Sequence, residues 1–224
     1  MFQIVPNRAT LSRMKEGTGR MGRKAGHGSS GAALAALCLC ARLPLLRVLL
    51  LSLAMAPFPA MADGNDDNNI CYAQFQGGNG KAAIDYCTRA IRSGDLAEPD
   101  LVAALINRGV AYKNAGDLKA AVSDYTLALK HAPRDALILA NRANALREMG
   151  DLEGARGDIE EALRLDPGRG PSFYVRGQIL EAMGDAEAAR KDYLQALTLE
   201  PENRDYQDRI LELDAKRVQG GQVQ

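Results

Sequence analysis

An internal repeat constrains the fold of this chain more than any other feature of its sequence. Residues 102–135, 136–169 and 170–203 are equal in length and align without gaps, and one pattern recurs in all three. The recurring residues are Arg108, Arg142 and Arg176; Gly116-Asp117, Gly150-Asp151 and Gly184-Asp185; Ala121, Ala155 and Ala189; Asp124, Asp158 and Asp192; Ala128, Ala162 and Ala196; and Pro133, Pro167 and Pro201. So many coincidences indicate an array of like units that stack on one another and share a core.

Each unit has the residues of two helices joined by a tight turn. The glycine near its middle is expected to end the first helix in the left-handed conformation, and the aspartate that follows is expected to cap the second helix. The proline near its end cannot continue a helix. Asp100 and Asp135 are predicted to cap the first helices of the first two units. Aromatic residues are scarce, at 5% with no tryptophan, which also favours helices packed on helices.

The pattern resembles the tetratricopeptide repeat family, whose members repeat bulky, small, aromatic, alanine and proline positions at fixed offsets within each unit. Residues 102–135 match it with Leu105, Gly109, Tyr112, Ala121, Tyr125, Ala128 and Pro133. Aliphatic residues replace some aromatic residues in the other two units, and arginine replaces the usual leucine before the small position in all three. The resemblance implies an all-α fold, an α-solenoid of helix-turn-helix repeats.

Residues 63–101 are predicted to hold one more, divergent repeat. Residues 81–91 align with residues 119–129, which requires a four-residue insertion before the next unit. In this register Cys71 lies at the small position of the first helix and Cys87 at the aromatic position of the second, so both face one helix–helix contact. They are the only cysteines after residue 62. We expect a disulfide between them in an exported chain, with two buried free thiols as the alternative.

Residues 204–217 are expected to form a capping helix after the last repeat. Tyr206, Ile210 and Leu213 recur at helical spacing, with charged residues at most other positions. Such a helix covers the apolar face of the last repeat and presents a polar face to water. Residues 218–224 are rich in Gly and Gln, have no pattern, and are predicted to be a disordered tail.

Residues 1–62 have the composition of a basic leader with a secretory signal peptide. They contain eight Lys and Arg and one Glu, and two of the arginines precede the apolar run 48–56. Ala60 and Ala62 form a small-x-small ending before Asp63. This order predicts cleavage after Ala62 and a periplasmic or secreted protein. The alternative is an uncleaved membrane anchor, although the run is much shorter than the ~20 apolar residues that span a bilayer.

The charges of the chain are divided unequally between this leader and the remainder. The whole chain has 28 Lys+Arg and 28 Asp+Glu, which leaves 20 bases and 27 acids after residue 62. This acidic balance argues against nucleic acid and anionic membranes as partners of the folded part.

Residues for catalysis, cofactors or metals are not brought together by the sequence. His131 is the only histidine after residue 62, so neither a Cys–His nucleophile nor a Cys/His zinc site can be built. Residues 77–81 lack the Ser/Thr and the glycine spacing of a phosphate-binding loop and are predicted to be a turn. Residues 63–69 are rich in Asp and Asn without the pattern of an EF-hand, and we expect a flexible start there. No enzymatic activity, cofactor or metal is therefore predicted.

The resemblance instead implies a binding surface, because in the family the first helices of successive repeats line a concave groove that holds a peptide or a partner helix. By phase, the groove residues are Asn107, Val110, Lys113 and Asn114 in the first unit, Asn141, Asn144, Arg147 and Glu148 in the second, and Tyr174, Gln178 and Glu181 in the third. Apolar residues occupy most positions with which chaperone-binding members hold a C-terminal carboxylate, so that ligand is not predicted.

The repeated arginines and aspartates have two interpretations. The arginines line the groove, or they pair with the aspartates of the same or the adjoining repeat. Equal spacing of both signs favours pairing, because a structural role recurs once per repeat and a ligand rarely does.

The predicted function is a non-enzymatic protein–protein interaction module or scaffold of the periplasm or cell envelope. Its partner would be a peptide or a helix of another protein in the concave groove. The alternative is a structural subunit of an envelope assembly that uses the convex face or the ends of the array.

Overall fold

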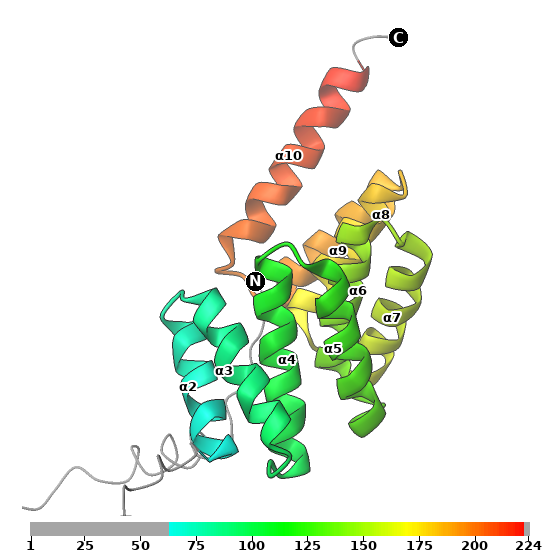
Figure 1. Cartoon of the computed structure of the whole chain (residues 1–224). Coiled ribbons are helices and arrows are strands. Elements are labelled where there is room, and N and C mark those ends of the chain that lie inside the picture. Colours follow the sequence, from blue (N-terminus) through cyan, green and yellow to red (C-terminus); the bar gives the residue numbers. More distant parts are fainter. Residues whose placement is uncertain (1–62, 222–224) are drawn as a thin grey trace, which may run out of the picture.

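A computed structural model describes residues 63–221, and every regular element in this part of the chain is a helix (Figure 1). The helices are α2 (Gly64–Gln76), α3 (Gly80–Ser93), α4 (Glu98–Asn114), α5 (Leu118–His131), α6 (Ala136–Met149), α7 (Leu152–Leu165), α8 (Gly170–Ala182), α9 (Ala186–Leu199) and α10 (Arg204–Gly221). Successive helices pack as pairs, α2 with α3 through α8 with α9, and each pair packs on the next. The predicted all-α solenoid is confirmed.

The turn inside each full repeat has the conformation that its Gly-Asp pair predicts. Gly116, Gly150 and Gly184 have φ angles of 83°, 87° and 89°, which side chains other than glycine rarely adopt. The aspartate that follows each glycine caps the second helix, because its carboxylate accepts a hydrogen bond from the N–H three residues later at 2.9–3.0 Å. Helices α5, α7 and α9 end two residues before the repeated proline.

The first helices begin in different ways. Asp135 caps α6 as predicted, by accepting hydrogen bonds from the N–H groups of Leu137 and Ile138 at 2.8 and 3.2 Å. The corresponding prediction for Asp100 is wrong, because α4 begins at Glu98, two residues before Asp100, and Asp100 lies within its first turn. Pro99 explains the earlier start, since proline is favourable in the first helical turn, where its missing N–H has no intrahelical partner.

The described chain begins directly with a helix. Helix α2 starts one residue after Asp63, whose carboxylate accepts a hydrogen bond from the Asn65 N–H at 2.9 Å. Asp67 is buried and forms an ion pair with Arg89 of α3 at 2.8 Å. The expectation of a flexible start over residues 63–69 is therefore wrong, because these polar side chains cap the helix and pair it with its neighbour.

The two helices of a repeat make a close contact through residues that are 16 positions apart in sequence. A disulfide joins Cys71 of α2 to Cys87 of α3, with their Cα atoms 5.1 Å apart and both side chains buried. In the first full repeat this position holds Gly109 and Tyr125, and a Cβ on Gly109 would lie 2.6 Å from the tyrosine ring. The third full repeat has the same glycine–tyrosine contact. The disulfide thus occupies a packing position that is common to the repeats.

Helix α10 packs on α9 as the first helix of a further repeat would. Ile210 and Leu213 join the core around Tyr193. Leu213 lies one repeat length after Ile179, which fills the corresponding core one repeat earlier. Leu211, by contrast, is 66% exposed.

The capping helix is longer than the sequence pattern predicted. It continues to Gly221, so the prediction of a disordered tail is wrong for residues 218–221, and residues 222–224 lie outside the described chain. Adding residues to an existing helix requires no new nucleus, which allows a segment without an apolar pattern to remain helical.

The predicted leader also lies outside the described residues, and cleavage between Ala62 and Asp63, with Ala60 at the small position, stays a prediction. Between residues 63 and 221, no helix combines the length and apolar character needed to cross a membrane. The same part of the chain contains no group of three His, Cys, Asp or Glu side chains that could hold a metal ion.

Candidate peptide-binding groove

The repeated arginines and aspartates form one ion pair in each full repeat. Each guanidinium donates two hydrogen bonds to the carboxylate 16 residues later, at N–O distances of 2.6–2.7 Å. The pairs are Arg108–Asp124, Arg142–Asp158 and Arg176–Asp192. This two-point geometry confirms that the residues pair with each other and connect the two helices of their repeat.

A hollow of about 220 Å³, which we call the polar hollow, lies between α6, α8 and α10. Six of the predicted groove residues line it, namely Asn141, Asn144, Arg147, Glu148, Tyr174 and Gln178. Its wall also includes Arg169, Asp205 and Tyr206, with apolar surface from Ala140, Pro171 and Val175. The first helices of the second and third repeats therefore form a concave surface together with the capping helix.

The polar hollow presents groups that suit an extended peptide backbone. The half-buried Gln178 amide can both donate and accept hydrogen bonds, as a peptide group does, and Asn141 and Asn144 add two largely buried amides to the wall. Tyr174 packs against Tyr206 of α10, with ring centroids 4.8 Å apart, so that the capping helix builds one wall. Aromatic walls offer apolar contact to the side chains of a bound segment.

Arg147 lies in the last turn of α6 and is positioned by residues of its own helix. Its Nε and Nη2 donate hydrogen bonds to Asn144 Oδ1 at 3.1 and 2.9 Å, and Nη2 also contacts Glu148 at 3.3 Å. Glu148 in turn pairs with Lys113 of α4 at 2.8 Å. Burial lowers the pKa of Lys113, although the bond to Glu148 opposes that effect. The Arg147 side chain remains 22% exposed.

The first full repeat contributes less to this surface than predicted. Val110 is completely buried in the core and Asn107 is 1% exposed, so their assignment to the groove is wrong. Both lie on α4, which packs against α2 and α6 as well as against its own partner helix. Lys113 is buried in its ion pair, and Asn114 lines a separate hollow beside the N-terminal repeat.

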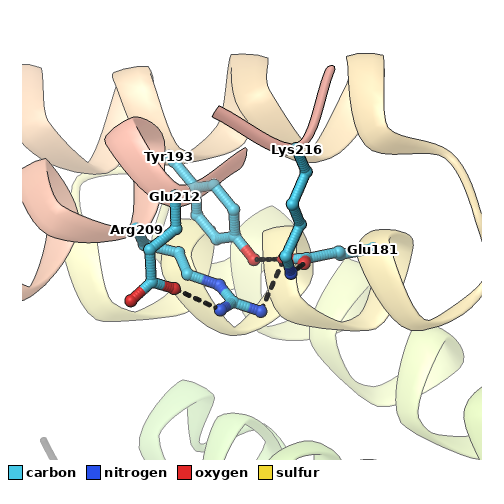
Figure 2. A network of polar contacts seen from close by, with 5 residues as sticks. All are labelled: Glu181, Tyr193, Arg209, Glu212 and Lys216. Atoms are coloured by element: carbon cyan, nitrogen blue, oxygen red, sulfur yellow. Dashed lines mark hydrogen bonds and ion pairs between the residues drawn. The ribbon is translucent and has the colours of Figure 1, made fainter. Parts of the chain in front are cut away.

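Glu181, the remaining predicted groove residue, connects α8 to α9 and α10 (Figure 2). It accepts a hydrogen bond from the Tyr193 hydroxyl at 2.9 Å and pairs with Arg209 at 2.8 Å and Lys216 at 3.3 Å. Burial disfavours the charged carboxylate, but the Tyr193 bond and the charges of Arg209 and Lys216 outweigh it and lower the pKa of Glu181. Next to this network is a second hollow of about 220 Å³, the adjacent hollow, lined by Arg147, Gln178, Glu181, Ala182 and Arg209.

Sequence reasoning missed three polar residues of the polar hollow, Arg169, Asp205 and Tyr206. Arg169 precedes α8, outside the first-helix positions that the family pattern assigns to the groove. Asp205 and Tyr206 belong to the capping helix, where Tyr206 was expected only to cover the last repeat. The sequence signal that could have found them is the repeat spacing, which continues into α10 and gives this helix the position of a first helix.

Models of the tetratricopeptide repeat family match residues 102–135, 136–169 and 170–203. No curated protein matches the sequence. Among solved structures, the first tetratricopeptide domain of human RPAP3 is 25% identical, with a TM-score of 0.51 over 54% of this chain and 95% of that domain. The first tetratricopeptide domain of Spaghetti (RPAP3) bound to the HSP90 peptide SRMEEVD is also 25% identical, with a TM-score of 0.50 over 52% and 95% of the two chains.

A third structure, MamA from Desulfovibrio magneticus RS-1, shares the fold at 20% identity, with a TM-score of 0.58 over 70% of this chain and 88% of that chain. The repeat matches, the paired helices and the solved relatives agree with one another. Together they show that residues 102–203 are tetratricopeptide repeats.

Proposed function

We propose that this protein is exported and binds a peptide segment of a partner protein in the concave groove between α6, α8 and α10. The observation that carries the proposal is the convergence of amide, arginine and tyrosine side chains from three helices on one hollow. Concave surfaces of this kind are the usual binding surfaces of helical repeat proteins. The peptide bound to the RPAP3 domain supports a peptide ligand for this chain as well.

Two features support export. The leader has the basic flank, apolar run and small-x-small ending of a signal peptide. The disulfide between Cys71 and Cys87 suits an oxidising compartment, because thiols in the cytosol are kept reduced. We expect the protein purified from its native host to begin at Asp63, as measured by N-terminal sequencing of the exported fraction. A full-length chain that stays in the membrane fraction would instead support the uncleaved anchor.

Photo-crosslinking tests the groove directly. A photoreactive residue at Gln178, in the polar hollow, is expected to crosslink the partner in the native compartment. The matched control is the same residue at Gln195, which lies exposed on α9. Crosslinks from Gln195 without any from Gln178 would contradict groove binding and favour a structural subunit that uses its convex face.

A further inference from the structure

Two ion pairs on the concave face connect residues that are 35 positions apart in sequence. Lys113 of α4 pairs with Glu148 of α6 at 2.8 Å, and Glu181 of α8 pairs with Lys216 of α10 at 3.3 Å. Between them, the same step from Arg147 of α6 leads to position 182 of α8, where the residue is alanine. The pattern of ion pairs between neighbouring first helices is therefore interrupted at its middle step.

Arg147 has hydrogen-bonding capacity that residues 63–221 do not use. Its bonds to Asn144 and Glu148 engage Nε and Nη2, and Glu148 is shared with Lys113. The Nη1 group has no partner among the described residues. Arg147 and Gln178 line both the polar hollow and the adjacent hollow, so they lie where the two meet.

Arg147, the ion pairs beside it and the charged residues of the far wall together contain five cations and four carboxylates, an excess of one positive charge. Lys113 neutralises Glu148, Lys216 pairs with Glu181, and Arg209 pairs with both Glu181 and Glu212. Arg169 and Asp205 add one charge of each sign to the far wall. Because residues 63–224 have 27 acids and 20 bases, a surplus cation in the groove stands out against an acidic molecule. It favours an anionic group of the ligand through charge complementarity.

We propose that Arg147 binds the side-chain carboxylate of an internal Asp or Glu in the peptide that occupies the groove, an inference that rests on the proposed function. A hydrogen bond between a guanidinium and a carboxylate is charge-assisted and therefore stronger than one between neutral groups. The acid is internal because a segment that fills both hollows passes Arg147 and continues beyond it. The Gln178 amide beside Arg147 can bond the backbone on either side of the acid.

Substitution of Ala182 separates ligand binding from folding. Ala182→Glu supplies the acidic partner that the middle step lacks, so Arg147 is expected to pair with α8 and become unavailable to a ligand. Ala182→Gln has nearly the same size without the charge and is the matched control. Both substitutions are on an exposed helix position, and circular dichroism should show wild-type helix content for each.

The probe is a library of random nonapeptides with acetylated N-termini and amidated C-termini, selected on the full chain. We expect the selected peptides to share an internal Asp or Glu, and to lose about tenfold in affinity when it becomes Asn or Gln. Ala182→Glu is expected to bind the acidic peptides about tenfold more weakly than Ala182→Gln does, because the two side chains fill the adjacent hollow alike and differ in charge. Arg147→Gln is expected to cause a similar loss relative to the wild-type chain. With Arg147→Gln, acidic and amide forms of one peptide should bind equally.

The outcomes distinguish the two proposals. Selected peptides without an acidic preference, or equal binding by the two Ala182 variants, would overturn the role of Arg147 and leave groove binding intact. If peptides bind only when their C-terminus is a free carboxylate, the internal acid is the wrong ligand group. If no peptide is selected, whether its C-terminus is amidated or a free carboxylate, the proposed function itself fails.

Discussion

At the scale of single residues, one position sets the distance between the two helices of a repeat. Four pairs of residues, equally spaced in sequence, occupy it: Cys71 and Cys87, Gly109 and Tyr125, Ala143 and Ile159, and Gly177 and Tyr193. A large ring requires glycine opposite, a branched aliphatic side chain accepts alanine, and two small thiols join covalently. In the three full repeats, a large side chain on the second helix is therefore matched by a small residue on the first.

Gly109→Ala is expected to destabilise the protein by about 1–2 kcal/mol, because the new Cβ would lie 2.6 Å from the buried Tyr125 ring and overpacking outweighs the gain in helix propensity. Urea unfolding measures the change. Gly157→Ala is the control, because a Cβ there meets nothing within 4 Å, and it should stabilise α7 by up to about 1 kcal/mol.

A second variant checks the cause. In a Tyr125→Ile background, which imitates the second full repeat, Gly109→Ala should cost much less than in the wild-type chain. An equal cost in both backgrounds would mean that the ring is not the source of the destabilisation.

At the scale of helices, the two ends of the array contain stabilising interactions in addition to the packing of one repeat on the next. The pair α2–α3 has a neighbouring repeat only at α4 within the described chain, and it contains the disulfide. Helix α10 packs mainly on α9, and the polar network of Glu181 ties it to α8 as well.

Reduction of the disulfide is expected to lower the free energy of unfolding by about 3 kcal/mol, the chain-entropy value for a loop of 16 residues. Unfolding with and without reductant measures it. The unreduced protein should also be lighter than the reduced one by two hydrogen atoms in an intact-mass measurement. Equal masses would mean that both cysteines are free thiols.

The attachment of α10 is expected to weaken in acid. The pKa of Glu181 is lowered in the folded state, so its contribution to stability is complete above the ordinary glutamate value of about 4.5 and is lost as pH falls through the lower, folded value. Unfolding followed between pH 6 and pH 3 should therefore show a decline that Glu181→Gln partly removes. An identical pH profile for the two proteins would contradict this role.

The elements were largely predictable from sequence because their signals are local. A Gly-Asp turn and a closing proline fix the ends of α5, α7 and α9 whatever surrounds them, and the regular Arg–Asp spacing predicted three ion pairs. Burial was not predictable in the same way. The repeat alignment places Val110 in the groove, but α2 and α6 cover α4 on both sides and bury it. The burial of Val110 thus depends on how the divergent N-terminal repeat docks on α4.

At the scale of the whole molecule, stability should vary along the array. Helical repeat proteins are stabilised by contacts between neighbouring repeats, so repeats with two neighbours are more stable than those with one. We expect amide hydrogen exchange to be slowest in α5, α6 and α7 and faster in α10, as measured by mass spectrometry. Uniform exchange from α2 to α10 would indicate that the array unfolds only as one cooperative unit.

Leu211 of α10 breaks a pattern that the preceding repeats share. It lies one repeat length after Gly177, at the position where glycine or alanine admits the second helix of a repeat. Helix α10 can therefore dock on the repeat before it, but its leucine would hold a second helix too far away to pack. Leucine at this position therefore suits α10 to packing on the repeat before it, and not to receiving a second helix of the kind that the full repeats contain.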